Sequence, residues 1–139
     1  MPNVRAIYTS KMSYHVGPMQ IQNILDVARL NNRHNDLTGL LCFGARQFLQ
    51  CLEGPREAVN YVYASIIRDS RHSSIVLLSY MEVENREFSD WKMGYVPESS
   101  MTSQVLSGTM GDGFFAPLKL NSHSALGFLQ DVKKCLPVL

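Results

Sequence analysis

Apolar and polar positions along the chain change their spacing several times, and each spacing predicts one type of element. Residues 4–8 are rich in strand-forming side chains, and strand alternation places Val4, Ala6 and Tyr8 on one face. A Gly-Pro pair at residues 17–18 then interrupts the chain, and proline suits the first turn of a helix. Beyond it, apolar residues recur at the spacing of a buried helical stripe: Ile21, Ile24, Leu25 and Ala28.

The same analysis of periodicity predicts the elements that follow. The polar run 31–36 ends the first helix, and a helix with its buried face at Val59, Val62, Tyr63 and Ile66 begins after residues 54–55. Four further strands are expected, at residues 37–43 as a fully covered strand, 47–53 as its hairpin partner, 75–81, and 91–95, where Trp91, Met93 and Tyr95 share one side.

This order predicts an α+β, ferredoxin-like β-α-β-β-α-β(β) sheet with two helices on one face. Residues 1–97 form the expected domain, and residues 98–139 an expected C-terminal helical extension that packs back on the sheet. Within the extension we expect a loop at 108–113 and a helix at 124–136. The candidate anchors of the extension are Phe114, Phe115 and Leu118.

Composition and charge narrow the class of protein. The 139 residues include 13 basic and 12 acidic side chains, so the net charge is +1, which argues against a nucleic-acid partner. Cys42, Cys51 and Cys135 have no metal-ligand spacing and are expected as reduced thiols. Because we find neither a signal-peptide pattern nor a long apolar run, we expect a soluble, cytoplasmic protein with no membrane partner.

Common catalytic and metal-binding motifs are absent from the sequence. We find no G-x-S-x-G, H-E-x-x-H, paired C-x-x-C or P-loop lysine, and the glycines near Gly111 lack the neighbours of a nucleotide-binding loop. The histidines are scattered, so no metal site is expected; they are His15, His34, His72 and His123.

Three polar residues occupy positions where the pattern calls for apolar ones. Gln50 lies between Phe48 and Leu52 on one strand face, and burying its amide unpartnered costs about 1–3 kcal/mol. Tyr8 ends an apolar strand face, and Asn32 continues the apolar stripe of the first helix. Each has an ordinary alternative: a backbone-bonded amide, an amphipathic core aromatic and a helix C-cap. Because the first and third strands are neighbours in this fold, we expect the three groups to form a polar site inside the core.

Six sequence segments together resemble the BLUF family of flavin-binding blue-light sensors, specifically its short stand-alone type. The resemblance covers roughly residues 1–97, and the extension is similar, more loosely, to the helical cap of the short members. The matching segments are Arg5-Ala6-Ile7-Tyr8-Thr9-Ser10, Asn31-Asn32, Leu37-Thr38-Gly39-Leu40-Leu41, Phe48-Leu49-Gln50-Cys51-Leu52-Glu53-Gly54, Asp69-Ser70-Arg71-His72 and Phe88-Ser89-Asp90-Trp91-Lys92-Met93.

The resemblance implies non-covalently bound FAD between the two helices. Asn32, with Asn31 nearby, would bind the polar edge of the ring, and Gln50 would lie between the flavin and the hydroxyl of Tyr8. The remaining residues implied for cofactor binding are Ile24 and Ile66 around the ring and Arg71 and His72 toward the phosphates, with Arg68 compensating for Ser65, where some members carry a basic residue.

The resemblance also implies a photoreceptor rather than an enzyme. Light would drive electron and proton transfer from Tyr8 to the flavin and rearrange the hydrogen bonds of Gln50, with Trp91 and Met93 passing the change on. Output would go to an unidentified partner protein or through homo-oligomer change. The alternatives are an RNA-binding module and a small acylphosphatase-like hydrolase. The third strand lacks the exposed aromatic residues of an RNA-binding module. The hydrolase would need an anion-binding loop after the first strand, where only Lys11 and His15 are available.

Overall fold

A computed structural model describes residues 2–12, 17–110 and 113–135 of the chain. One five-stranded sheet has the strand order β4-β1-β3-β2-β5, and only the β2–β5 pair is parallel. The elements are β1 (Asn3–Met12), α1 (Pro18–Asn35), β2 (Thr38–Gly44), β3 (Gln47–Pro55), α2 (Arg56–Ile67), β4 (His72–Val83), β5 (Gly94–Pro97), η1 (Glu98–Ser100), α3 (Ser103–Met110), η2 (Pro117–Lys119) and α4 (Ser122–Lys133).

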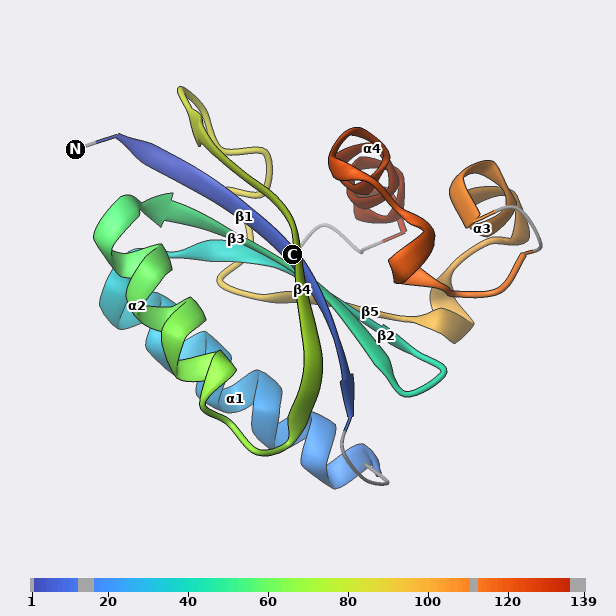
Figure 1. Ribbon diagram of the computed structural model, residues 1–139, viewed down its shortest axis with the longest axis horizontal. Coiled ribbons are helices and arrows are strands. Elements are labelled where there is room, and N and C mark those ends of the chain that lie inside the picture. Colours follow the sequence, from blue (N-terminus) through green and yellow to red (C-terminus); the bar gives the residue numbers. More distant parts are fainter. Residues whose placement is uncertain (1, 13–16, 111–112, 136–139) are drawn as a thin grey trace.

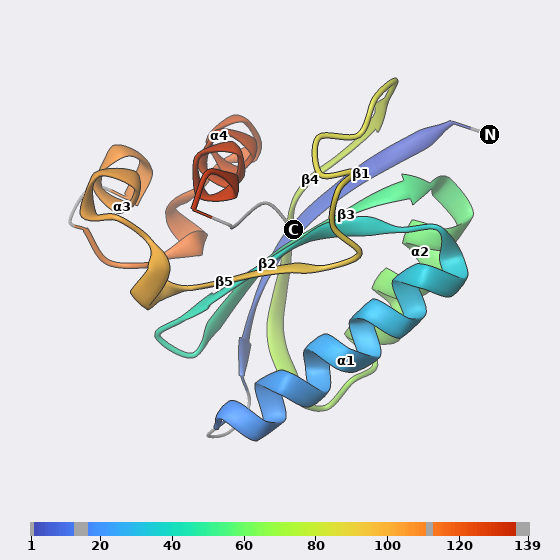
Figure 2. The same cartoon turned by 180° about the vertical axis from the view of Figure 1, so that it is seen from behind.

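The sheet separates two layers of helices (Figure 1). Helices α1 and α2 cover one face, and α3 and α4 lie on the other, as the reverse view in Figure 2 also shows. The α+β, ferredoxin-like prediction is therefore confirmed, with β1 and β3 as central neighbours.

Two apolar clusters fill these layers, and strand alternation sorts the residues between them. Val4, Ala6 and Tyr8 belong to the cluster under α1 and α2, whereas Ile7 belongs to the cluster under the C-terminal helices. In β2, Leu41 faces the first cluster and Leu40 the second, so this strand is covered on both sides as predicted. Residues of α4, among them Phe128 and Leu129, share the second cluster with Ile7 and Leu40 of the sheet.

The connection between β4 and β5, residues 84–93, departs from the prediction. Strand β5 begins at Gly94, so the expected strand at 91–95 is wrong at its start. Trp91 and Met93 do not share a face: Met93 is in the cluster beside α1 and α2, and Trp91 packs against the cluster beside α4. Strand alternation does not apply here because this backbone is irregular and is held by hydrogen bonds from other elements, among them Gly39 N–H to the Trp91 carbonyl at 3.0 Å.

Several predicted boundaries and anchors also need correction. The first helix continues through the polar run to Asn35 and ends at Asp36, whose left-handed backbone (φ 56°) donates its N–H to the Asn32 carbonyl. Gly108 lies inside α3 rather than in a loop; of that predicted loop, residues 111–112 are outside the described part, as are His15 and residue 136. Phe115 is buried as predicted, but Phe114 and Leu118 are exposed.

A buried ion pair joins the sheet to residues 84–93. Glu53 accepts a hydrogen bond from Arg5 Nε at 2.7 Å, and both side chains are nearly inaccessible. The same carboxylate accepts the backbone N–H groups of Glu87 at 2.9 Å and Phe88 at 2.7 Å. Three donors satisfy one buried charge, so the interaction fixes this connection against the central strands.

Replacing Glu53 tests that role. Glu53→Ala leaves the Arg5 guanidinium and two backbone N–H groups without their acceptor inside the protein, and the free energy of unfolding should fall by about 3–5 kcal/mol. The measurement is urea unfolding followed by circular dichroism. The matched control is Glu82→Ala, which removes the exposed ion pair with Arg56 and should cost less than about 1 kcal/mol. Equal losses in the two variants would contradict the assigned importance of the buried pair.

Candidate functional site

A tyrosine and a glutamine meet in the cluster beneath α1 and α2. Tyr8 of β1 and Gln50 of β3 are direct cross-strand partners, and the Tyr8 hydroxyl donates a hydrogen bond to Gln50 Oε1. Both side chains are buried. The other end of the amide, Nε2, contacts Met93 Sδ at 3.7 Å. The predicted encounter of Tyr8 and Gln50 is therefore present in the structure, and it extends to Met93.

The surroundings of Tyr8 keep its phenol protonated. Burial raises the pKa of Tyr8 well above its usual value, and the neighbouring Tyr63 and Cys51 raise it further. The Tyr63 ring packs edge-on against Tyr8, with 5.0 Å between ring centroids. Tyr8 is thus a neutral hydrogen-bond donor aimed at a neutral amide.

Asn32 is the most informative polar group, because one of its atoms lacks a partner. The residue is fully buried near the end of α1, and Asn32 Nδ2 donates to the Lys92 carbonyl. Among the described residues no donor reaches Asn32 Oδ1. An unsatisfied buried carbonyl costs about 1–3 kcal/mol, so its persistence points to a ligand N–H as its partner.

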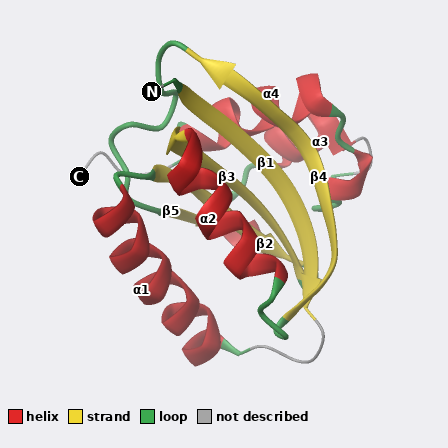
Figure 3. Ribbon diagram, turned by 60° about the vertical axis from the view of Figure 1, so that its left-hand side comes forward, coloured by secondary structure: helices red, strands yellow, loops and turns green. Residues whose placement is uncertain are grey.

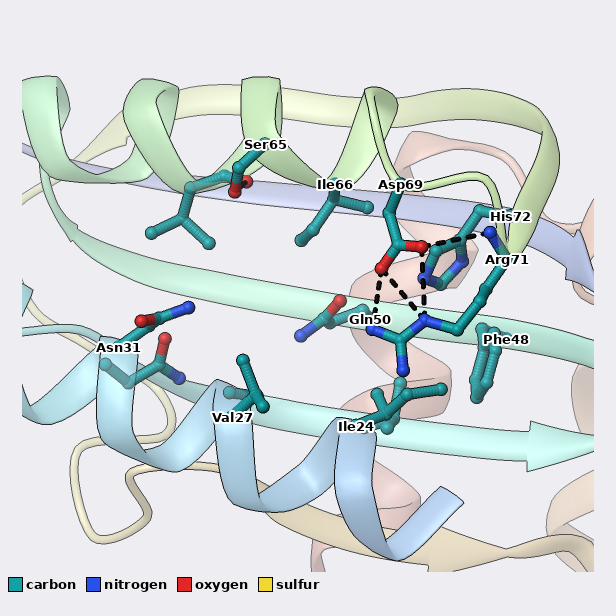
Figure 4. Close-up of a pocket in the computed structure, with 14 residues that line it drawn as sticks. Ile24, Val27, Asn31, Phe48, Gln50, Ser65, Ile66, Asp69, Arg71 and His72 are labelled. Atoms are coloured by element: carbon teal, nitrogen blue, oxygen red, sulfur yellow. Dashed lines mark hydrogen bonds and ion pairs between the residues drawn. The ribbon is translucent and has the colours of Figure 1, made fainter. Parts of the chain in front are cut away.

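A pocket opens between α1 and α2 above the sheet, lined by Asn32 and Gln50 (Figure 4). In this view Ile24, Val27 and Asn31 reach in from α1, and Ile66 reaches in from α2. The cavity measures about 100 Å³, whereas sites for drug-sized ligands hold roughly 300–1,000 Å³. A tricyclic ring therefore requires the walls from α1 and α2 to move apart. The other lining residues are Ala28, Leu41, Phe48, Val62, Ser65, Asp69, Arg71 and His72.

Arg71 is held at the pocket by a carboxylate that the sequence analysis did not single out. Arg71 Nη2 donates to Asp69 Oδ2 at 2.7 Å, and the Arg71 backbone N–H donates to Asp69 Oδ1 at 2.9 Å. The side-chain hydrogen bond from Arg71 is the main cause that lowers the pKa of Asp69. The spacing Asp-x-Arg was the available signal, because Asp side chains commonly bond the backbone two residues on.

His72 lies beside Arg71 at the start of β4. Its Nδ1 is 2.9 Å from Ser10 Oγ, and its ring is 5.3 Å from the ring of Phe48. Burial lowers the pKa of His72, Asp69 opposes this effect, and Arg71 adds to it. The ring is therefore neutral near pH 7, and it forms one end of the pocket.

Most residues expected at the cofactor do line this pocket. Arg68 does not: it is exposed at the C-terminal end of α2 and is absent from the pocket lining. Trp91 is also remote, since it packs on the opposite side of the sheet. Val27, Phe48 and Asp69 line the pocket without having been predicted as site residues.

The chemistry of the lining residues fits a flavin. Apolar side chains from both helices suit the faces of a planar ring, and the free Asn32 Oδ1 suits a ring N–H. Within the described ranges, His, Cys, Asp and Glu side chains form no group of three or more able to hold a metal ion. The same ranges contain no helix long and apolar enough to cross a membrane.

Comparison with known proteins identifies relatives along most of the chain. The family model described as "BLUF: Sensors of blue-light using FAD" matches residues 4–94. A curated relative, the blue light- and temperature-regulated antirepressor BluF of Escherichia coli (strain K12), is 38% identical over 72 residues, which are 52% of this chain and 18% of the relative. The chain thus spans less than a fifth of the length of that relative.

Two solved structures show the same fold. The ground state of BlsA superposes with a TM-score of 0.84 at 31% identity, covering 93% of this chain and 86% of that one. A bacterial light-regulated adenylyl cyclase superposes with a TM-score of 0.70 at 28% identity, covering 95% of this chain and 35% of that one. The shared region is therefore found both in a chain of similar size and as one part of a larger protein.

The environment of His72 predicts a pH dependence of stability. Because its pKa is lowered on folding, the unfolded chain takes up the proton first as the pH falls below 6.5, and stability falls with it. The midpoint of thermal unfolding should decrease between pH 7 and pH 5, and His72→Gln should show a smaller decrease. His34 is the control: it is exposed, so His34→Gln should behave as the unmodified protein does. Identical profiles for the unmodified protein and His72→Gln would refute the assignment.

Proposed function

The chain belongs to the BLUF family, the sensors of blue light using FAD, and we propose that it is a photoreceptor whose signal begins at Tyr8 and Gln50. It binds FAD non-covalently and catalyses no turnover. One observation carries this proposal: the phenol of Tyr8, the amide of Gln50 and the thioether of Met93 form a continuous buried chain, and its central amide lines the same pocket as Asn32, whose Oδ1 has no partner among the described residues.

The pocket residues divide the binding of FAD between the ring and the rest of the molecule. Asn32, supported by Asn31 and Gln50, offers amide groups to the polar edge of the ring, and Ile24 and Ile66 cover its faces. Arg71 and His72 are the polar groups left for the ribitol and phosphates. Because Asp69 already neutralises Arg71, the charge offered to phosphate is weak, and most binding energy comes from the ring.

Bound FAD would supply absorption of blue light and an excited state able to accept an electron and a proton and to return both. Tyr8 is the donor, because it is buried, protonated and already bonded to the amide. Loss of an electron would make the phenol strongly acidic, so its proton would pass along the existing hydrogen bond to Gln50 Oε1 while Gln50 Nε2 gives up one of its own protons to the electron acceptor. Return of the electron and of one proton to Tyr8 would leave Gln50 rotated or tautomerised, with its donor and acceptor ends exchanged and no net charge added.

The partner of Gln50 Nε2 connects this exchange to the rest of the protein. An amide that no longer donates to Met93 Sδ releases that side chain, and the Met93 carbonyl is itself bound by Arg29 Nε at 3.1 Å. We therefore assign Met93 the role of receiving the signal. Trp91 acts later, on the far side of the sheet.

Residues 84–93 also contact the C-terminal extension, which we propose as the output region, residues 98–139. Lys133 Nζ donates to the Glu87 carbonyl at 2.7 Å, and Gln130 Nε2 donates to Glu87 Oε1 at 3.0 Å. The Lys133 ammonium lies 5.7 Å from the ring centroids of both Phe88 and Trp91. Displacement of this connection changes the surface of α4, which then acts on a partner protein or on the assembly of copies of the chain.

The rival functions have no support beside this one. The family match covers residues 4–94, and the family binds a flavin, whereas the rival functions require RNA or an acyl phosphate as ligand.

Cys42 and Cys51 are buried free thiols, a state typical of reducing compartments, and we place the protein in the cytoplasm.

Replacing the amide tests the relay. Gln50→Leu leaves an apolar side chain in the core but removes both hydrogen-bonding ends, so FAD should remain bound while the light-induced shift of its absorption band disappears. The measurement is a light-minus-dark absorption spectrum of the purified protein. Gln104→Leu, on the exposed face of α3, is the control and should keep the full shift. A normal shift in Gln50→Leu would defeat the relay.

Replacing the phenol tests the electron donor. Tyr8→Phe removes the hydroxyl alone, so flavin binding should persist while the photocycle is lost or reduced at least tenfold in yield. Tyr63→Phe is the matched control, since that ring contacts Tyr8 but its hydroxyl is not part of the chain to Gln50. An intact photocycle in Tyr8→Phe would assign the donor to another residue.

A further inference from the structure

The ion pair between Asp69 and Arg71 lies at one end of the pocket. Both residues belong to the short connection between α2 and β4, and Figure 3 shows this connection at the same end of the helix layer as the start of α1. Arg71 Nη1 reaches across to α1, where it donates to Asn23 Oδ1 at 3.3 Å. In Figure 4 the pair lies at the opposite end of the pocket from Asn31. A ligand whose ring is bound near Asn31 would therefore extend its remaining groups toward this ion pair.

The carboxylate of Asp69 occupies donors of Arg71 that a phosphate would need. Arg71 Nε lies 3.1 Å from both carboxylate oxygens of Asp69, and Nη2 lies 2.7 Å from one of them. A guanidinium binds carboxylate and phosphate with the same planar set of N–H groups, so the two anions compete for it. The side-chain hydrogen bond from Arg71 lowers the pKa of Asp69, and the carboxylate therefore stays ionised at neutral pH.

The described lining of the pocket contains no second cation that could compensate for this pairing. Arg71 is the only lysine or arginine among those residues. His72 is the other basic group there, and burial lowers its pKa, so it is neutral near pH 7. Because the charges of Asp69 and Arg71 cancel, this end of the pocket offers no net positive charge to a phosphate monoester, which carries about −1.5 to −2 charge at pH 7.

We propose that Asp69 is a specificity-determining residue, which occupies the donors of Arg71 and makes the pocket select a flavin by its ring and the uncharged groups attached to it. The inference rests on the proposed function, since it concerns the ligand of the same site. A phosphate that displaces the carboxylate gains hydrogen bonds from Arg71 but leaves Asp69 ionised beside a second anion, so the exchange is of little benefit. Riboflavin, which has no phosphate, should then bind about as tightly as FMN.

Competition between riboflavin and FMN tests this inference, because the two flavins differ only in the phosphate. Protein loaded with FAD is equilibrated in about 0.1 M salt with an excess of both flavins in equal amounts. The bound flavins are then released and separated by chromatography. The ratio of bound FMN to bound riboflavin measures the discrimination without reference to the photocycle. We expect this ratio to lie within about threefold of one for the unmodified protein.

Variants of the ion pair separate the effect of charge from the effect of shape. Asp69→Asn keeps the size of the side chain but removes the negative charge beside Arg71, so the ratio should rise about tenfold or more. This rise should shrink between about 0.1 M and 1 M salt. The double variant Asp69→Asn/Arg71→Gln removes both charges and should return the ratio to within about threefold of the unmodified value.

Asp131→Asn is the matched control. It removes the same charge from an exposed ion pair with Lys134, and α4 lies on the other face of the sheet from the pocket. The ratio should therefore stay at the unmodified value, because an exposed charge at this distance is screened by salt. Bound riboflavin shows that each variant is folded.

The outcomes distinguish this inference from the function on which it rests. If no flavin binds the unmodified protein, both are overturned, since there is then no flavin site. If flavin binds but the unmodified protein prefers FMN beyond the expected range, only the role of Asp69 is overturned. An Asp69→Asn variant that binds riboflavin with an unchanged ratio, or a rise of equal size in Asp131→Asn, would overturn it as well.

Discussion

The hydrogen bond between Tyr8 and Gln50 is the interaction around which the rest of the protein is arranged. Two polar side chains in an apolar core are tolerated only if their hydrogen-bonding groups are satisfied, and each satisfies part of the other. The hydrogen-bonding groups of this pair that remain free need Met93 or a ligand as their partner. The phenol is held neutral by low-dielectric surroundings, and in such surroundings any change in this hydrogen bond costs free energy. That free energy can shift the conformation of the neighbouring backbone.

A second constraint comes from the single sheet shared by two cores. Residues facing α1 and α2 belong to the flavin side, and residues facing α4 belong to the extension, so events on one side reach the other only through the sheet or around its end. Residues 84–93 provide the second route. They are tied to Glu53 in the sheet, to Asn32 and Arg29 in α1, and to Lys133 in α4.

Sequence patterns predicted those features of the fold that depend on interactions between residues close in the sequence. Alternation placed Tyr8 and Gln50 on their faces, and the topology of the fold made β1 and β3 neighbours, so their meeting was predictable. The separation of Trp91 from Met93 was not, because it depends on hydrogen bonds from Gly39 and Asn32, residues more than 50 positions earlier. The exposure of Phe114 likewise follows from tertiary packing and leaves no periodic signal in the sequence. The contact of Asp69 with Arg71 is local instead, and its Asp-x-Arg spacing was the signal that could have indicated it.

Residues 91–93 are held by three carbonyl groups in succession, each accepting from a different donor: Gly39, Asn32 and Arg29. Displacing Met93 means disturbing several of these bonds at once, and so does returning it. Both directions then cross a barrier raised by these bonds, and we expect the switched form to outlast the light that made it. A molecule of this kind would respond to the accumulated exposure rather than to short changes in intensity. Its persistence is set by backbone contacts that never touch the chromophore.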